Sequence, residues 1–377
     1  MSARTEVDGK GVGTVVDDDR KLTSLSLESE EAQKPRRGRL RRVLIVLSSL
    51  LVVLALAAGG GALYLNQRFT GQIGTLADDP FDVPATTRPE KVTTGKAATA
   101  INILLAGSDA NNDEQTTGAG AGSAWERTGQ RTDSIMIVHL SGDRKSAAVM
   151  SIPRDSWVEI PGHGTNKINA AYSFGGPKLF VATVEKLTNI HIDHLAFVDW
   201  NGFMSLTDAL GGVDIAVAGS VQGVTGKSFG PGVTHFNGED ALDFVRERKS
   251  VPGGDFGRQK RQQAFLRALM TKMMDSGALK NPVKLVKVLD ALTNNLSVDA
   301  GLTGGKMRGI GADITGLKRQ DVTFMSVPNA GTDMVSGQSV VLLDKSKCAQ
   351  LWKSVRDDDI GKYLEIYGAD TLAGSVS

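Results

Sequence analysis

The run Ile101-Asn-Ile-Leu-Leu-Ala106 predicts the first strand of a folded domain and, with its neighbours, the fold class. It is short, apolar and bounded by Gly107, which is typical of a buried strand. Asp109 follows just past its end. Ligands of open α/β sheets bind beyond the carboxyl ends of the strands, so Asp109 indicates a binding rim at that edge.

Charged residues also flank the next two predicted strands. Ser134 to Leu140 is preceded by Arg131-Thr-Asp133, and Ala147 to Ile152 is followed by Pro153-Arg154-Asp155. Hydrophobic spacing predicts further strands at His194 to Trp200, Val213 to Val217, Val322 to Val327 and Val340 to Leu343, and helices at Pro177 to Thr188, Asn237 to Val245 and from about Asp255 onward. We therefore predict an α/β fold whose central, mostly mixed sheet is flanked by helices.

A single membrane anchor is predicted before this domain. Val43 to Leu65 carries no charge and is long enough for the ~20 residues that cross a bilayer as a helix. The basic segment Lys34 to Arg42 precedes it, so the positive-inside rule places the N-terminus in the cytoplasm and the domain outside, as a single-pass type II protein of the cell membrane. A cleaved signal peptide fits less well, because the apolar run is too long and starts too far from residue 1.

The chain of 377 residues is thus divided into four predicted parts. They are a disordered cytoplasmic tail with a basic juxtamembrane segment (1–42), the transmembrane helix (43–65), an extracytoplasmic linker (66–98) and the folded α/β domain (99–377). The formal net charge of +1 implies no general attraction to nucleic acid, so an anion site has to be local. Cys348 is the only cysteine, which excludes an intrachain disulfide, and we interpret it as a packed core thiol.

The segment from Arg246 to Gln262 concentrates positive charge. Arg246, Arg248, Arg258 and Arg261 surround a Pro-Gly-Gly turn and one acid, Asp255. Guanidinium groups bind phosphate oxygens in bidentate geometry, and the first turn of a helix offers free N–H groups to an anion. The segment therefore predicts a phosphate site. The simpler alternatives are surface cations paired with neighbouring acids and an Asp255 that only caps its helix.

The helix after Asp255 is predicted to present one mixed face. Arg258, Arg261, Gln262 and Phe265 stand at i, i+3, i+4 and i+7, and Leu269 continues the stripe. Such a helix brings its first turn to a phosphate while its later turns join a hydrophobic wall.

Two carboxylates suffice for a metal site next to phosphate. Mg²⁺ commonly uses one or two protein carboxylates together with phosphate oxygens and water, so Asp109 and Asp133 are candidate ligands of Mg²⁺ or Mn²⁺. The alternative is that both acids only flank strands. The five histidines include no pair at the i, i+4 spacing of zinc ligands, and we expect them to be structural.

Six motifs in order resemble the signature of the LytR-CpsA-Psr family, over about residues 100–275. They are Asn102 to Asp109, Arg131 to Ser134, Ser151 to Asp155, Lys167 to Ala170, Leu210 to Asp214, and Arg246-x-Arg248 followed by Asp255-x-x-Arg258-x-x-x-Gln262. The resemblance implies the catalytic fold of that family. It also implies an enzyme that ligates a glycopolymer from a polyprenyl-pyrophosphate carrier to the muramic acid 6-hydroxyl of peptidoglycan, forming a phosphodiester.

The resemblance also implies roles for individual residues. Asp109 and Asp133 are expected to hold the metal, Asp255 to orient the arginines, and Asp133 or Asp155 to act as general base. The residues expected to bind the pyrophosphate are Arg131, Arg154, Lys167, Asn169, Arg246, Arg248, Arg258, Arg261 and Gln262. Those expected to act in catalysis are Arg131, Arg154, Asp155, Arg246, Arg248 and Asp255.

The lipid carrier requires an apolar pocket. Helical segments that contain Phe174, Phe180, Val184, Phe265 and Leu269 are the candidates, although any protein core would use the same residue types.

Several functional alternatives stay open. The polymer can be wall teichoic acid, capsular polysaccharide or arabinogalactan, and the Gly/Ala-rich composition favours an actinobacterial source and hence arabinogalactan. A pyrophosphatase that uses water as acceptor and a non-enzymatic envelope regulator are the other two hypotheses.

Overall fold

The computed structural model describes residues 74–76, 79–108, 117, 132–247, 254–275, 288, 291 and 295–368. The chain divides into two compact units, Met1–Gly60 and Gly61–Ser377, and the described residues all belong to the second. The predicted span Val43 to Leu65 lies outside them. Within the described ranges, none of the helices combines the length and the apolar character needed to cross a bilayer.

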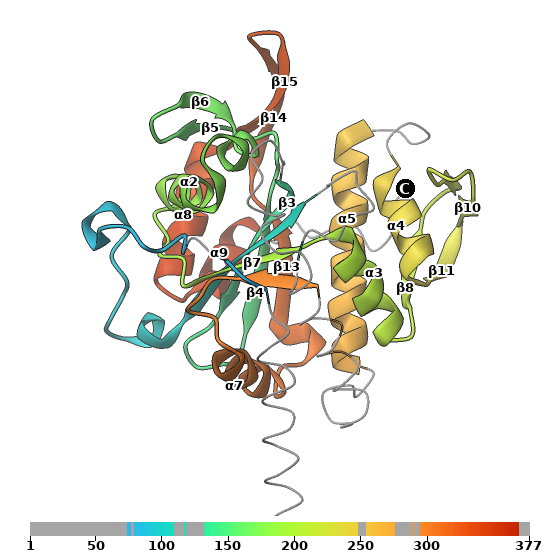
Figure 1. Cartoon of the computed structure of the whole chain (residues 1–377), viewed down its shortest axis with the longest axis horizontal. Helices are drawn as coiled ribbons and strands as arrows, with labels where there is room; N and C mark the ends of the chain where they lie inside the picture. The colour runs from blue at the N-terminus through green and yellow to red at the C-terminus, as the bar shows by residue number, and fades with distance from the viewer. Residues whose placement is uncertain are drawn as a thin grey trace, which may run out of the picture. The chain divides into compact units, whose positions relative to one another are not determined.

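A seven-stranded mixed sheet forms the centre of the domain (Figure 1), in the order β1-β12-β7-β2-β3-β4-β13. Its strands are β1 (Gly74–Thr75), β2 (Ile101–Ser108), β3 (Thr132–Leu140), β4 (Ala147–Ile152), β7 (His194–Val198), β12 (Leu296–Val298) and β13 (Val322–Ser326). β2 pairs in parallel with β7, β13 pairs in parallel with β4, and β3 is antiparallel to both β2 and β4. The predicted α/β fold with a mixed sheet is confirmed.

This topology brings several chain segments to one edge. The last residues of β2, β4, β7 and β13 and the first residue of β3 all lie at the same side of the sheet. We refer to this side as the carboxyl edge and to the opposite side as the amino edge. Arg154 and Asp155, which follow β4, lie at the carboxyl edge as the sequence predicted, whereas Asp109 and Arg131 lie outside the described residues.

The two faces of the sheet have separate cores. On the first face, Leu104 and Ala106 of β2 pack with α2 (Ala170–Thr188) and α8 (Lys345–Arg356), which Figure 1 shows beside the sheet. On the second face, Ile103 and Leu105 join a smaller cluster with α7 (Gly304–Ile314). The strict alternation along β2 reflects the period of two that strands impose on side chains.

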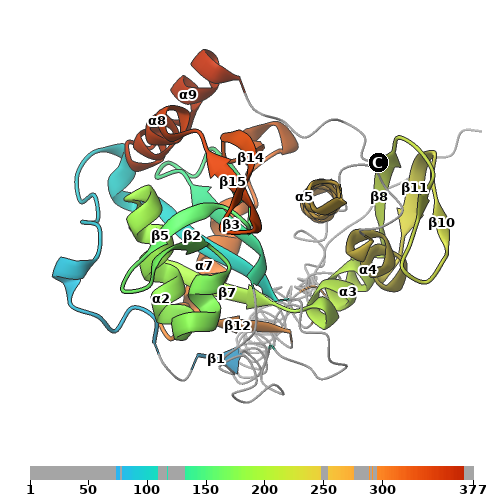
Figure 2. The same ribbon diagram turned by 90° about the horizontal axis from the view of Figure 1, so that it is seen from above.

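A second group of elements has its own hydrophobic core. It contains α3 (Trp200–Ala209), α4 (Gly238–Arg246), α5 (Gly254–Asp275), β8 (Val213–Val217), β9 (Val221–Gln222), β10 (Ser228–Phe229) and β11 (Gly232–Phe236), which Figure 2 shows together. β8 pairs with β11 rather than with the central sheet. The rings of Phe236 and Phe244 pack 4.8 Å apart in this core, and Phe265 of α5 contacts Phe203 at 3.9 Å.

Local signals explain where several helices start. Asn237 caps α4 by accepting a bond of 2.8 Å from the backbone N–H of Asp240, as the sequence predicted. α2 begins at Ala170, earlier than predicted, but its backbone leaves helical geometry at Gly175 and Gly176. Pro177 then opens the second segment, in agreement with the predicted start there, because proline suits the first position of a helix.

Two hairpins follow β4 and β13. They are β5 (Trp157–Ile160) with β6 (Gly164–Lys167), and β14 (Asn329–Val335) with β15 (Gln338–Leu343). The predicted strand at Val340 to Leu343 is therefore half of a hairpin and not a strand of the central sheet. Val341 donates to the carbonyl of Asp155 at 2.9 Å, which holds the second hairpin against the carboxyl edge.

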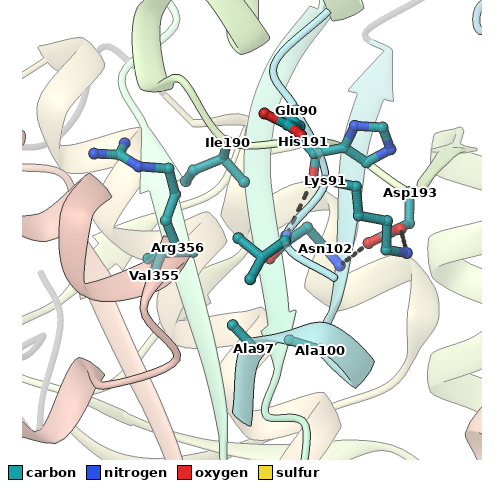
Figure 3. A pocket seen from close by; sticks show the side chains of 11 residues that line it. Glu90, Lys91, Ala97, Ala100, Asn102, Ile190, His191, Asp193, Val355 and Arg356 are labelled. Carbon is teal, nitrogen blue, oxygen red and sulfur yellow. Dashed lines mark hydrogen bonds and ion pairs between the residues drawn. The ribbon is translucent and has the colours of Figure 1, made fainter. Parts of the chain in front are cut away.

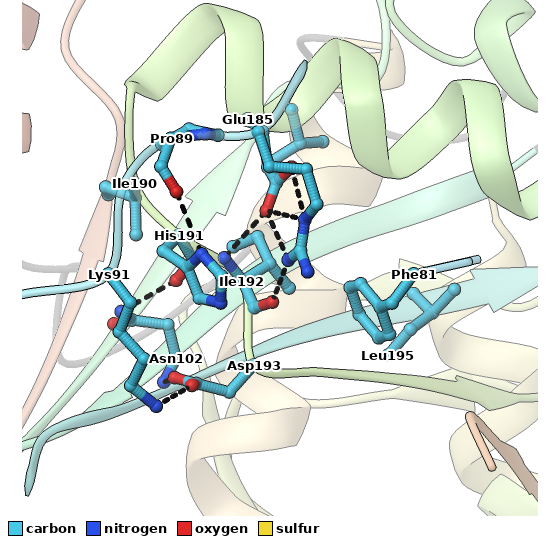
Figure 4. A network of polar contacts seen from close by, with 12 residues as sticks. Phe81, Pro89, Lys91, Asn102, Glu185, Ile190, His191, Ile192, Asp193 and Leu195 are labelled. Atoms are coloured by element: carbon cyan, nitrogen blue, oxygen red, sulfur yellow. Dashed lines mark hydrogen bonds and ion pairs between the residues drawn. The ribbon is translucent and has the colours of Figure 1, made fainter. Parts of the chain in front are cut away.

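The described part of the predicted linker is bound to the domain. β1 adds a strand to the central sheet beside β12. Further on, Arg88 binds the carboxylate of Glu185, with Nη2 at 2.7 Å from Oε1, and its guanidinium lies 4.6 Å from the ring of Phe81. Figure 4 shows this network, in which His191 also bonds to the carbonyl of Pro89. The short helices η1 (Ala85–Thr87) and η2 (Lys96–Thr99) lie in the same segment, and η5 (Arg319–Asp321) and α9 (Ile360–Tyr367) complete the domain.

Candidate functional site

A charged cluster lies at the carboxyl edge, just past the end of β4. The Nε atom of Arg154 is 3.4 Å from one oxygen of Asp155, and the Nζ atom of Lys167 is 3.2 Å from the other. The backbone N–H of Asn169 donates to the carbonyl of Arg154 at 3.2 Å. The structure thus brings together four of the predicted site residues. All but Asn169 are half-buried, so the cations remain accessible to a ligand.

A β-bulge marks the neighbouring strand. Gly107 lies opposite Ser134 and Ser108 lies opposite Thr132, so Asp133 is an extra residue in β3. Bulges next to active sites re-aim side chains and end regular pairing. The side chain of Asp133, and Asp109 and Arg131 altogether, lie outside the described residues, so the predicted metal pair stays a prediction. Among the described residues, no group of three or more His, Cys, Asp or Glu forms a metal site.

The basic segment begins at the C-terminal end of α4. Arg246 is the last residue of α4, and Glu247 after it is extended, with φ −62° and ψ 137°. Arg248 lies outside the described residues. α5 starts at Gly254, so Asp255 belongs to its first turn, and the side chain of Asp255 lies outside what the structure describes. An acid in the first turn still favours the helix through its dipole.

The predicted mixed face of α5 is buried. Arg258 is 2% exposed, Arg261 0%, Gln262 7% and Phe265 0%. Leu269 continues this stripe into the core shared with α3, α4 and β8. Burial of a guanidinium group costs free energy unless its partners compensate the charge.

Arg261 has a structural partner within the described part of the chain, and its assignment to phosphate stays a prediction. Its Nη2 atom donates to the backbone carbonyl of Glu247, between Arg246 and Arg248, and its guanidinium lies 5.8 Å from the ring of Phe244. Burial lowers the pKa of Arg261, and the nearby Glu247 carboxylate partly opposes this effect. Arg261 therefore fixes the end of α4, and with it the start of the arginine pair.

α5 extends past the carboxyl edge. The Oε1 atom of Gln263 accepts a bond of 3.2 Å from Ser326 at the end of β13, and Arg267 lies over the ring of Phe324 at 5.7 Å. Moving four residues forward along α5, from Gln263 to Arg267, corresponds to moving two residues backward along β13, from Ser326 to Phe324. Four helical residues rise ~6 Å and two strand residues ~6.6 Å, so the two lengths agree and α5 runs antiparallel to β13. Its first two turns, which contain Arg258, consequently project beyond the edge where Arg154 lies.

Gln263 also lies at the carboxyl edge, and the sequence analysis did not select it. The spacing of three and four residues selected the face of Arg258 and Gln262, and Gln263 does not belong to that face. The available signal was a second glutamine directly after Gln262, just before the apolar residues of the helix.

The five residues predicted to line a lipid pocket are not brought together. Phe180 and Val184 belong to the core of the first sheet face, whereas Phe265 and Leu269 belong to the core around α4. Phe174 is 45% exposed and stacks on His163, with ring centroids 4.9 Å apart. Periodicity identified buried helical positions but not the core that each of them joins.

The cysteine and two of the histidines make structural contacts. Cys348 is buried and donates to the carbonyl of Pro328 at 3.2 Å; burial, and secondly Asp344, raises its pKa to about 12. His194 bonds to Asp299 at 3.2 Å, and His139 bonds to Asp358 at 2.9 Å. These contacts confirm the packed thiol and the structural histidines.

Two cavities lie away from the carboxyl edge. The first is at the amino edge, where Figure 3 shows Asn102, His191 and Arg356 among its lining residues. The second is an open groove between the linker and the later turns of α2, and Arg88 and Glu185 are among its lining residues. Both adjoin the linker and neither includes a predicted phosphate ligand.

The comparison with protein families shows to which family the chain belongs. The profile of the LytR_cpsA_psr family matches residues 77–357, which cover the whole carboxyl edge. The chain belongs to the LytR_cpsA_psr family. The match starts within the predicted linker, in agreement with the packing of that segment as part of the LytR_cpsA_psr domain.

Over the matched residues, relatives with named functions are about a third identical to this LytR_cpsA_psr chain. The cell wall biosynthesis protein LcpA of Corynebacterium glutamicum is 32% identical over 279 residues, 65% of this chain and 53% of LcpA. The chain thus spans about half the length of that relative. The polyisoprenyl-teichoic acid–peptidoglycan teichoic acid transferase TagU of Bacillus mycoides is 32% identical over 67% of this chain and 79% of TagU.

Solved structures of similar proteins share the fold. TagV of B. subtilis is 26% identical, with a TM-score of 0.56 over 70% of this chain and 98% of TagV. A structure of TagT bound to LIIa-WTA is also 26% identical, with a TM-score of 0.56 over 72% of this chain and 96% of TagT. The mixed sheet flanked by helices is therefore the common architecture.

Proposed function

We propose that this protein is a phosphotransferase that ligates a glycopolymer from a polyprenyl-pyrophosphate carrier to the muramic acid 6-hydroxyl of peptidoglycan, forming a phosphodiester. The observation that carries the proposal is the cluster of Arg154, Asp155 and Lys167 at the carboxyl edge of the sheet, the same edge at which Gln263 of α5 bonds to Ser326. The transferase name of TagU and the binding of LIIa-WTA by TagT support it.

The proposed reaction is an in-line displacement at phosphorus. The acceptor hydroxyl oxygen bonds to the sugar-linked phosphorus, the bond from that phosphorus to the bridging oxygen breaks, and polyprenyl phosphate leaves. The hydroxyl proton passes to a carboxylate of the edge, Asp133 or Asp155. Arg154, Lys167, Arg246 and Arg258 neutralise the charge on the phosphoryl oxygens, and one such preorganised donor contributes on the order of 10²–10³ in rate.

The donor set at the edge fits a hard divalent cation. Asp133 is the bulged residue beside the pair Ser108–Thr132, and Asp109 follows Ser108 directly in the sequence. Two carboxylates next to phosphate oxygens are the ligands that Mg²⁺ or Mn²⁺ takes. Such an ion would supply positive charge to the diphosphate and its leaving group.

The lipid is proposed to lie against the second face of the sheet. Ile103 and Leu105 of β2 and Phe324 of β13 are half-buried on that face, and Phe324 lies against Arg267 of α5. In the same proposal Val43 to Leu65 anchors the chain in the cell membrane, with the catalytic domain outside.

A reconstituted assay tests the proposal. Full-length protein is incubated with a labelled polyprenyl-pyrophosphate glycan, Mg²⁺ and uncrosslinked peptidoglycan, and the ligated product is isolated. We expect phosphodiester-linked glycan, loss of product when EDTA removes the metal, and a decrease of about 10²-fold or more in Arg154→Ala. Donors that carry arabinogalactan, teichoic acid or capsular glycan identify the polymer, for which we propose arabinogalactan.

Two outcomes would replace this proposal. Phosphate-capped free glycan without any ligated product would indicate a pyrophosphatase. Product formation unchanged in both Arg154→Ala and Asp133→Ala would indicate a role for this site other than catalysis, as in an envelope regulator.

A further inference from the structure

Gln263 is buried with hydrogen-bonding capacity left over. Its side chain is 5% exposed, and its Oε1 atom accepts a bond of 3.2 Å from the hydroxyl of Ser326. Its Nε2 atom is buried and has no hydrogen-bond partner within the described part of the chain. Buried amide groups in folded proteins are normally bonded, so a donor left open at the end of β13 points to a ligand.

The amide is held at the carboxyl edge. Ser326 is the last residue of β13 and lies opposite Ser151 of β4, which is shortly followed by Arg154. Helical geometry turns Gln263 roughly 160° away from Arg261, so it faces the sheet while Arg261 faces α4. The bond to Ser326 fixes the amide plane and thereby the direction of its N–H groups.

We propose that Gln263 is a further phosphate-binding residue, whose Nε2 donates to a phosphoryl oxygen of the lipid-linked diphosphate. This inference rests on the proposed function. An amide NH₂ group only donates, so its partner must be an acceptor atom. The cations Arg154 and Arg258 at the same edge favour an anionic acceptor, and a diphosphate offers several such oxygens. Ser326 is then a positioning residue that orients the amide.

Substitutions separate this role from a structural one. Gln263→Met keeps the length and removes the donor, Gln263→Glu turns a carboxylate toward the phosphate, and Ser326→Ala removes only the anchor. Gln350→Met on the exposed side of α8 is the matched control. A polar group with an open bond is replaced by an apolar one at little cost, so we expect the thermal midpoint of Gln263→Met to stay at or above that of the wild type.

Binding is measured on full-length protein by calorimetry, with geranylgeranyl diphosphate and geranylgeranyl monophosphate as probes. We expect Gln263→Met to weaken diphosphate binding about tenfold to a hundredfold, Gln263→Glu more than that, Ser326→Ala less, and Gln350→Met not at all. A smaller effect on the monophosphate would place the contact on the second phosphoryl group, and an equal effect would place it on the phosphate that both probes share.

Three results would overturn the inference. In the first, Gln263→Met binds the diphosphate as tightly as the wild type. In the second, Gln263→Glu binds it more tightly than Gln263→Met. In the third, the thermal midpoint of Gln263→Met is lowered enough to account for its loss of binding. Failure of the proposed function looks different. In that case the wild type binds the diphosphate but forms no ligated product, and the order of the variants in binding is unaffected.

Discussion

Arg154 and Arg261 carry the same side chain in different environments. Arg154 is half-buried at the carboxyl edge and shares Asp155 with Lys167. Arg261 is fully buried and donates to the carbonyl of Glu247. The sequence predicts phosphate binding for both, because charge and spacing do not reveal which way a guanidinium points. At this scale the structure separates a half-buried arginine, which we propose to bind the phosphate, from a buried one that bonds to the backbone.

The two arginines should respond differently to the same substitution. Arg261→Met leaves the buried Glu247 carbonyl without its donor, so we expect the free energy of unfolding to decrease by about 1–3 kcal/mol. Arg154→Met is expected to change it by less than about 1 kcal/mol, while transfer decreases by about 10²-fold or more. Urea denaturation and the transfer assay on both variants measure this.

The opposite pattern would contradict the assignment. If Arg261→Met were as stable as the wild type and lost transfer as completely as Arg154→Met, Arg261 would contact the phosphate. Arg261→Lys serves as control, because it retains a charged donor and should recover part of the stability.

Single elements were largely predictable, but their partners were not. Val213 to Val217 and Val340 to Leu343 are strands as predicted, yet β8 pairs with β11 and β15 pairs with β14. Hydrophobic alternation identifies a strand, whereas pairing depends on which edge is available after folding. In the same way, the polar composition of residues 66–98 suggests a stalk, although its described part forms β1 and the network around Arg88.

The ion pair of the linker tests how firmly that element is attached. Glu185 is 3% exposed and Arg88 14%, so Arg88→Met leaves a buried carboxylate with its charge uncompensated. We expect the free energy of unfolding to fall by about 3–5 kcal/mol. Lys91→Met, which removes a lysine that is 46% exposed and pairs with Asp193, is the matched control and should cost less than about 1 kcal/mol.

Chemical denaturation of both variants gives these values. Equal stability of Arg88→Met and Lys91→Met would show that the linker is only loosely associated with the domain. A large loss in Arg88→Met alone would show that the domain begins well before residue 99.

The whole molecule is proposed to place its domain outside the membrane. We predict that external protease digests the domain in intact spheroplasts while an epitope tag at the N-terminus survives, because the basic segment Lys34 to Arg42 stays in the cytoplasm. Lysed spheroplasts are the control, in which the tag is also cut. Loss of the tag in intact spheroplasts would reverse the proposed topology.

Local patterns were sufficient for the mixed α/β fold, the strand ends that form the carboxyl edge and membership in the LytR_cpsA_psr family, because short-range periodicity and ordered motifs are written along the chain. Folding alone made the bond between Gln263 and Ser326, which are 63 residues apart, and the pair of Arg88 and Glu185, which are 97 apart. It also divided Phe180 and Phe265 between two cores. A period indicates which face of an element is buried, but the surface that this face meets belongs to residues distant in sequence, and only the folded chain brings the two together.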